Sequence, residues 1–221
     1  MTQKFTILFD LDGTLIDTAP DLIRAHNHVM KKFGYPTKKL GELKNAVGKG
    51  AKAMMAKANG QWKWFDEKIQ NEMTNEFLSY YGENILHESK LINGVKEFLN
   101  WCKKENISMA VCTNKTEHLA VDLLKKIGIY DYFEYVAGYN TFEYCKPDPR
   151  HLTTIIEILD GDINKSIMIG DSETDANAAK AVEIPIILLK YGYTEKKSSE
   201  IYHNHLVKDF VGIEKIINEY L

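Results

Sequence analysis

A short apolar segment that runs directly into two aspartates constrains the fold of this chain more than any other feature. Residues 7–9, Ile-Leu-Phe, show no alternation with polar residues, which is typical of a strand covered on both faces. Asp10 and Asp12 follow, and Gly13 allows the backbone to turn so that both carboxylates can converge. Open parallel sheets bind their ligands at the carboxyl ends of strands. The segment therefore predicts an acidic site at the end of a buried strand.

Two carboxylates this close repel each other unless a cation lies between them or one of them keeps its proton. Mg²⁺ would remove that repulsion, because it prefers carboxylate ligands combined with a phosphate. The simpler alternative is an ordinary Asp-Gly turn after a core strand. A binding site, unlike a turn, requires partner residues elsewhere in the chain.

Strand and helix patterns alternate through the second half of the chain. We expect strands at 107–112, 135–137, 167–169, 184–189 and 206–207, and helices at 95–101, 117–127, 149–159, 174–182 and 211–220. Repeated β-then-α units predict an α/β fold, a doubly wound, Rossmann-like parallel sheet with helices on both faces and right-handed crossovers.

Residues 16–87 interrupt this alternation with helical patterns and no convincing strand. A helix begins near Pro20 and ends at Gly34, and further helical patterns cover 43–58 and 68–81. These helices could simply pack on the sheet, but their own apolar faces favour a separate lobe. We therefore expect a catalytic core of residues 1–15 and 88–221 and an inserted helical cap of residues 16–87.

Composition narrows the class of protein further. The 221 residues are 44% hydrophobic and 27% charged, with a net charge of −3 and no basic block, so nucleic-acid binding is not expected. No apolar run approaches the length of a membrane span, and no signal-peptide pattern precedes the first strand. Three cysteines without CxxC spacing argue against a disulfide framework and suit the cytoplasm. Monomer and homodimer remain open.

Three more groups of polar residues follow expected strands. Thr113 and Asn114 offer a hydroxyl and backbone N–H groups that can hold a phosphate, although Thr-Asn is also a common helix start. Lys146 precedes a proline-stiffened helix start, although a lone lysine is usually a solvated charge. Asp171 ends a strand and Asp175 lies one helical turn later, as in any acidic helix N-terminus.

Taken together and in chain order, these motifs resemble those of the haloacid-dehalogenase-like phosphohydrolases. The resemblance covers essentially the whole chain and implies that Asp10 is the nucleophile and a Mg²⁺ ligand. It implies that Asp12 is the general acid and base and binds the metal through its main-chain carbonyl. Removal of either carboxylate would then nearly abolish turnover.

The same resemblance assigns the remaining motif residues. Thr113, with Asn114 beside it, and Lys146 would hold the transferring phosphoryl group. Asp171 would be a further metal ligand, and Asp175 a partner of Lys146 or of the metal.

Smaller features look like those of bacterial phosphoglycolate phosphatases, namely residues 17–22, 47–51 and 191–193. The resemblance implies a small phosphorylated metabolite, 2-phosphoglycolate, as substrate. That subfamily often has Arg where this chain has Lys44, and Lys is a less directional partner for a carboxylate. Lys44 and Lys49 are the candidate substrate-binding residues of the cap, and a solvated helix face is the alternative for both.

Other chemistries occur on the same motifs. Dehalogenases do not need the second aspartate, so the presence of Asp12 favours phosphoryl transfer. A phosphonate hydrolase would need a Schiff-base lysine in the cap, for which Lys44, Lys49 and Lys52 are candidates. A β-phosphoglucomutase-like sugar-phosphate mutase and a broad-specificity sugar phosphatase are the main alternatives. A catalytically silent binding protein would be expected to lack a motif residue, and this chain has all of them.

Overall fold

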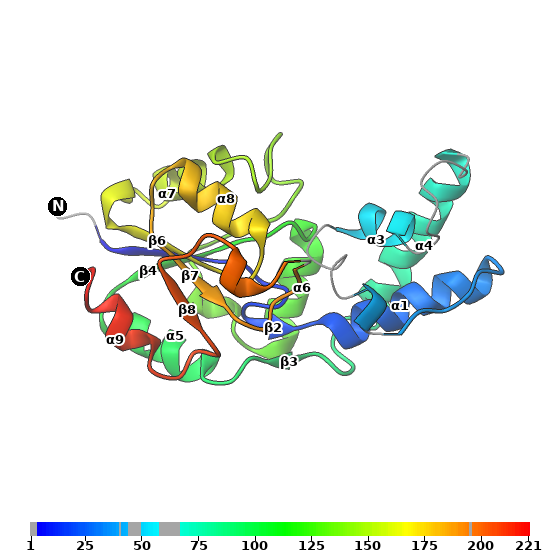
Figure 1. Ribbon diagram of the computed structural model, residues 1–221, viewed down its shortest axis with the longest axis horizontal. Coiled ribbons are helices and arrows are strands. Elements are labelled where there is room, and N and C mark those ends of the chain that lie inside the picture. Colours follow the sequence, from blue (N-terminus) through cyan, green and yellow to red (C-terminus); the bar gives the residue numbers. More distant parts are fainter. Residues whose placement is uncertain (1–3, 40, 44–49, 58–66, 195) are drawn as a thin grey trace.

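The computed structural model describes residues 4–39, 41–43, 50–57, 67–194 and 196–221, and its centre is a parallel six-stranded sheet (Figure 1). The strand order is β5-β4-β1-β6-β7-β8. The strands are β1 (Thr6–Phe9), β4 (Ser108–Cys112), β5 (Tyr135–Ala137), β6 (Ser166–Gly170), β7 (Ile186–Leu189) and β8 (His205–Val207). All five pairings are parallel, and β1 lies between β4 and β6. The predicted α/β class is therefore confirmed.

Helices cover both faces of this sheet because successive strand residues point in opposite directions. Ile7 and Phe9 pack in one apolar cluster with α5 (Val95–Lys104), α6 (Glu117–Ile127) and α9 (Ile213–Ile217). Leu8 packs in the other with α7 (Arg150–Ile158) and α8 (Glu173–Ala181). Figure 1 accordingly shows α7 and α8 on one side of the sheet and α5 and α9 on the other. Three short 3₁₀ helices complete the core: η1 (Tyr130–Tyr132), η2 (Ile163–Lys165) and η3 (Ser198–Glu200).

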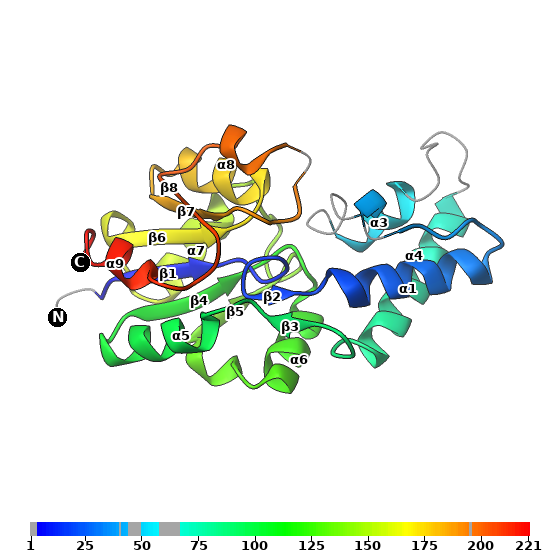
Figure 2. The same cartoon turned by 60° about the horizontal axis from the view of Figure 1, so that its bottom comes forward.

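A second group of helices stands beside the carboxyl ends of the strands (Figure 2). It consists of α1 (Ala19–Lys32), α3 (Ala51–Lys57) and α4 (Glu67–Glu83). Pro20 lies in the first turn of α1, and Gly34 follows its end with φ of +76°, as the sequence predicts. Part of the expected helix over 43–58 lies outside the described residues. The limits of the cap at 16 and 87 stay a prediction.

Two connections join the helical group to the core, and they pair through β2 (Ile16–Asp17) and β3 (Lys90–Leu91). Strands of two residues carry no periodicity, so the sequence does not reveal them. The expected helix over 211–220 is also shorter in the structure, because α9 starts only after Gly212. No helix among the described residues is both long enough and apolar enough to cross a membrane.

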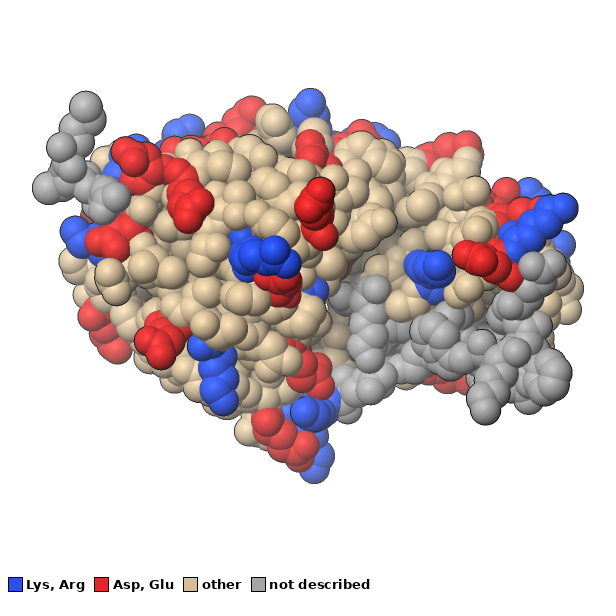
Figure 3. All heavy atoms as spheres, turned by 90° about the horizontal axis from the view of Figure 1, so that it is seen from above, with Lys and Arg blue, Asp and Glu red and all other residues tan. Residues whose placement is uncertain are grey.

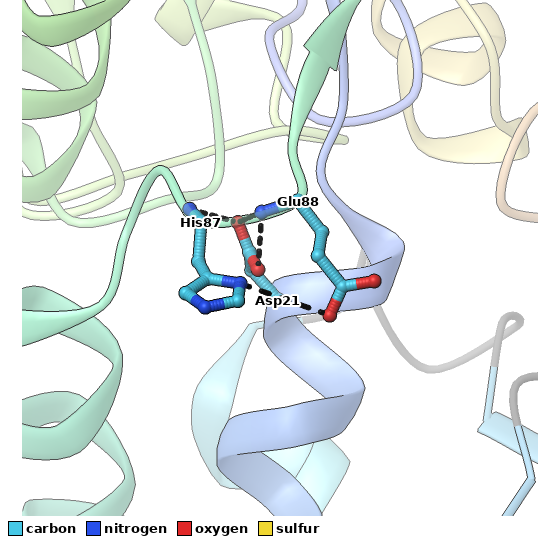
Figure 4. A group of neighbouring side chains, drawn as sticks. All are labelled: Asp21, His87 and Glu88. Carbon is cyan, nitrogen blue, oxygen red and sulfur yellow. Dashed lines mark hydrogen bonds and ion pairs between the residues drawn. The ribbon is translucent and has the colours of Figure 1, made fainter.

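Asp21, in the first turn of α1, holds the two connections together (Figure 4). Its buried carboxylate accepts hydrogen bonds from the backbone N–H groups of His87, Glu88 and Ser89 at 2.9–3.1 Å and from the Ser89 hydroxyl at 2.7 Å. Arg24 adds an ion pair at 2.9 Å. Burial alone would raise the pKa of Asp21, but the hydrogen bonds outweigh it and the pKa lies below its usual value.

Replacement of Asp21 by alanine should therefore destabilise the protein. Asp21→Ala leaves several backbone N–H groups without their acceptor, and we expect the free energy of unfolding to fall by about 2–4 kcal/mol. Denaturant unfolding measures this change. Asp209→Ala is the matched control, because that carboxylate accepts two hydrogen bonds close to the surface and its loss should cost under about 1 kcal/mol. Equal losses of stability in the two variants would contradict a stabilising role of the Asp21 hydrogen bonds between the two connections.

Candidate active site

The parallel sheet places three carboxylates at one edge. Asp10 follows β1, and its N–H donates to the Ile169 carbonyl in β6 at 2.9 Å, so it lies beside the end of that strand. Asp171 follows β6, and Asp175 lies in the first turn of α8. Oxygen atoms of Asp10, Asp171 and Asp175 all lie within 4.8 Å of one another. The predicted convergence of carboxylates from separate strand ends is thus present.

Lys146 lies between two of these carboxylates. Its buried Nζ is 2.9 Å from Asp10 Oδ1 and 2.6 Å from Asp175 Oδ1. Burial disfavours the ammonium, but Asp10 and Asp175 outweigh that effect and hold the pKa of Lys146 above its usual value. The second oxygen of Asp175 accepts bonds from the N–H groups of Asp171 and Ser172 and from the Ser172 hydroxyl at 2.8–3.1 Å. Asp175 therefore caps α8 and orients Lys146 at the same time.

Asp171 is fixed by its neighbours. Its carboxylate accepts the Tyr193 backbone N–H at 2.6 Å and the Thr14 hydroxyl at 3.3 Å. Gly13 has φ of +85°, and a side chain there would collide with Asp171. The Tyr193 hydroxyl in turn bonds to Asp17 at 2.5 Å, so the loop at 191–193 joins this carboxylate to a cap connection.

The carboxylate of Asp12 has different partners. Lys115 Nζ lies 3.0 and 3.2 Å from its two oxygens, and the Thr18 hydroxyl donates to Oδ1 at 2.7 Å. Lys115 also donates to the Tyr81 hydroxyl of α4 at 2.9 Å. No role of Lys115, Thr18 or Tyr81 was expected from the sequence. Only the position of Lys115, two residues after Thr113, could have suggested one.

The predicted phosphate-binding pair lies at the end of β4. Thr113 is buried, and its hydroxyl accepts the Lys115 N–H at 3.2 Å. Asn114 donates to the Lys146 carbonyl at 2.9 Å, while its buried side-chain oxygen has no hydrogen-bond partner among the described residues. Both residues line the cavity described next and could donate or accept bonds there. Lys44 and Lys49 lie outside the described residues.

A cavity of about 250 Å³ separates these groups from helices α1, α3 and α4. Its core side is polar and its cap side largely apolar, with Leu22, Met54, Phe77, Leu78 and Tyr81. A volume near the lower end of the usual range for ligand pockets favours a small substrate. On the face drawn in Figure 3, basic and acidic side chains are interspersed, so this face has no continuous basic surface.

The charges in this site do not balance. Four buried carboxylates face two buried ammonium groups of the described chain: Asp10, Asp12, Asp171 and Asp175 against Lys115 and Lys146. Burial, opposed in part by Lys146, raises the pKa of Asp10 to about 6. Burial, together with Asp175 and Asp10, also raises the pKa of Asp171. A divalent cation would supply the missing charge, and the oxygen donors of Asp10 and Asp171 fit Mg²⁺.

A second acidic group, Asp21 with His87 and Glu88, does not have these properties. The Asp21 oxygens already accept N–H and O–H donors, and His87 and Glu88 are exposed. This group fits the connection between the lobes described above rather than a metal site.

Comparisons with known proteins agree with this geometry. The model of the haloacid dehalogenase-like hydrolase family matches residues 7–189. Phosphoglycolate phosphatases of Mesorhizobium japonicum and Agrobacterium fabrum are each 36% identical, over 92% and 97% of this chain and 90% and 92% of their own. A crystal structure described as a predicted phosphoglycolate phosphatase from Haemophilus somnus superposes with a TM-score of 0.91, at 29% identity over 98% of this chain and 99% of its own. The chain therefore belongs to the haloacid dehalogenase-like hydrolase family.

Proposed function

We propose that this protein is a Mg²⁺-dependent phosphomonoesterase that converts 2-phosphoglycolate to glycolate and phosphate through an aspartyl-phosphate. The observation that carries the proposal is the position of Asp10. Its carboxylate lies at the end of β1 on the core side of the cavity, 2.9 Å from the Lys146 ammonium and close to Asp171. A buried carboxylate with a fixed cation beside it suits attack on phosphorus.

The reaction would proceed in two steps. An oxygen of Asp10 forms a bond to phosphorus while the bond to the leaving oxygen breaks, and Asp12 gives its proton to that oxygen. Asp12 then takes a proton from water as the water attacks the aspartyl-phosphate, which releases phosphate and restores Asp10. Lys146, Thr113 and Asn114 would hold the phosphoryl oxygens. Mg²⁺, held by Asp10, Asp171 and the Asp12 carbonyl, would supply further positive charge.

Two observations support a small phosphorylated acid as the substrate. The curated relatives named above are phosphoglycolate phosphatases and match nearly the full chain. The cavity is small. We further propose that Lys44 and Lys49, which lie outside the described residues, contact the substrate carboxylate. A β-phosphoglucomutase of Clostridium difficile shares the fold with a TM-score of 0.79 at 19% identity, which shows no more than the fold.

The nucleophile is tested by an isosteric substitution. Asp10→Asn should lower kcat at least about 1,000-fold, because an amide cannot take the place of the attacking carboxylate. Phosphate release measures this loss, and circular dichroism checks the fold. Asp122→Asn, at an exposed carboxylate paired with Lys126, is the matched control and should keep wild-type activity. A folded Asp10→Asn variant with substantial turnover would exclude Asp10 as the nucleophile.

Metal binding should depend on pH, because Mg²⁺ binds carboxylates that have lost their protons. With the pKa of Asp10 at about 6, Mg²⁺ affinity should fall about tenfold from pH 7 to pH 5, and the raised pKa of Asp171 adds to the fall. Isothermal titration calorimetry measures the affinity directly. Asp171→Asn should weaken binding at pH 7 as well. Constant affinity across this range, or an unaffected Asp171→Asn variant, would remove these carboxylates from the metal site.

The substrate assignment requires a comparison of esters. Wild-type kcat/KM should be higher for 2-phosphoglycolate than for hexose phosphates. If a charged contact to the substrate carboxylate is lost, Lys44→Ala or Lys49→Ala should lower kcat/KM for 2-phosphoglycolate about 10- to 100-fold more than for p-nitrophenyl phosphate. Lys32→Ala, at a cap lysine paired with Glu76, is the control. Isomerisation of glucose 1-phosphate without phosphate release would instead indicate a mutase.

A further inference from the structure

Lys115 lines the cavity, and its ammonium group is buried and hydrogen-bonded. Its side chain is only 5% exposed, and its Nζ contacts both oxygens of Asp12 and the hydroxyl of Tyr81. The same Nζ lies 4.4 Å from the centre of the Tyr81 ring. An ammonium removed from water needs such partners, and these three match its three N–H donors. The position of Lys115 is therefore determined by Asp12 and Tyr81.

Asp12 is held from the opposite direction by Thr18, whose hydroxyl donates to Oδ1 at 2.7 Å. Thr18 is the residue before α1, and Tyr81 lies in the last turn of α4. The residue before α1 thus contacts the Asp12 carboxylate directly, and the end of α4 contacts it through Lys115. Among the described residues, no other carboxylate of the site is linked to both α1 and α4 by such hydrogen bonds.

We propose that Lys115 is the positioning residue of the general acid Asp12, and that Tyr81 connects this ion pair to the cap. The inference rests on the proposed function. Asp12 must present one oxygen to the leaving group, and free rotation of its side chain would leave the proton misdirected. The Lys115 ammonium on both oxygens and the Thr18 hydroxyl on Oδ1 together fix the orientation of the Asp12 side chain.

The role of a general acid depends on the leaving group. An alkoxide leaves poorly without a proton, whereas p-nitrophenolate leaves readily, so the acid matters much less for p-nitrophenyl phosphate. The parameter kcat/KM reports the steps up to loss of the leaving group, and hydrolysis of the aspartyl-phosphate does not enter it. A comparison of kcat/KM between ester types therefore isolates the first proton transfer.

The experiment measures kcat/KM for 2-phosphoglycolate, for glycerol 2-phosphate, which has no carboxylate, and for p-nitrophenyl phosphate. Lys115→Met should lower kcat/KM for both alkyl esters about 10- to 100-fold more than kcat/KM for p-nitrophenyl phosphate. This loss is smaller than the full contribution of a general acid, because Asp12 itself is still present. Tyr81→Phe keeps the ring and removes the hydroxyl, and it should give the same pattern at about 3- to 10-fold. This second variant keeps the test valid if Lys115→Met folds poorly.

Matched controls are available in the same chain. Lys125→Met removes an exposed lysine that lies 4.9 Å from the Tyr130 ring, and Tyr80→Phe removes the neighbouring hydroxyl on α4. Both should leave all three values unchanged.

Three results would overturn the inference. Equal losses on all three esters would make Lys115 a structural residue, and a loss confined to 2-phosphoglycolate would make it a contact of the substrate carboxylate. Unchanged kinetics of the folded variants would also exclude it. Failure of the proposed function is distinguishable, because the wild-type protein would then release no phosphate from any of the esters.

Discussion

The site depends on the buried ion pairs of Lys146. Without this ammonium, Asp10 and Asp175 would be two carboxylates that repel each other in a medium where water cannot screen them. Because one carboxylate of the pair also caps α8, the start of that helix and the position of the lysine are determined together. The excess negative charge that remains is what a divalent cation would neutralise. A single lysine thus makes it possible to bury the Asp10 and Asp175 carboxylates side by side.

The apolar core explains why the site is rigid. The four central strands, β1, β4, β6 and β7, are buried along their whole length, and β1 is held in register by β4 and β6 on either side. Side chains that follow the strand ends inherit that register, which brings Asp10, Thr113 and Asp171 to the same end of the sheet. This is why a local pattern of apolar residues followed by polar ones predicted the fold and the end of the sheet at which Asp10, Thr113 and Asp171 lie.

The sequence could not predict contacts between distant polar residues. Lys115 carries no local signal that it pairs with Asp12, and Tyr81 lies in a helix whose pattern indicates packing alone. The same holds for Asp21, which satisfies backbone groups 66 to 68 positions away. Each of these contacts depends on how the helical group is placed against the core. Periodicity describes one element at a time and contains no information on that placement.

That placement has a mechanical consequence. Asp21 fixes the two connections to each other, and Tyr193 bonds to Asp17 in one connection and to Asp171 in the site. The points about which the cap would rotate are therefore close to the carboxylates. Rotation about such points displaces the far ends of α1 and α4 most and Asp171 least. If the helical group moved as a lid over the proposed aspartyl-phosphate, this arrangement would let the cavity open while the charged groups of the core kept their geometry.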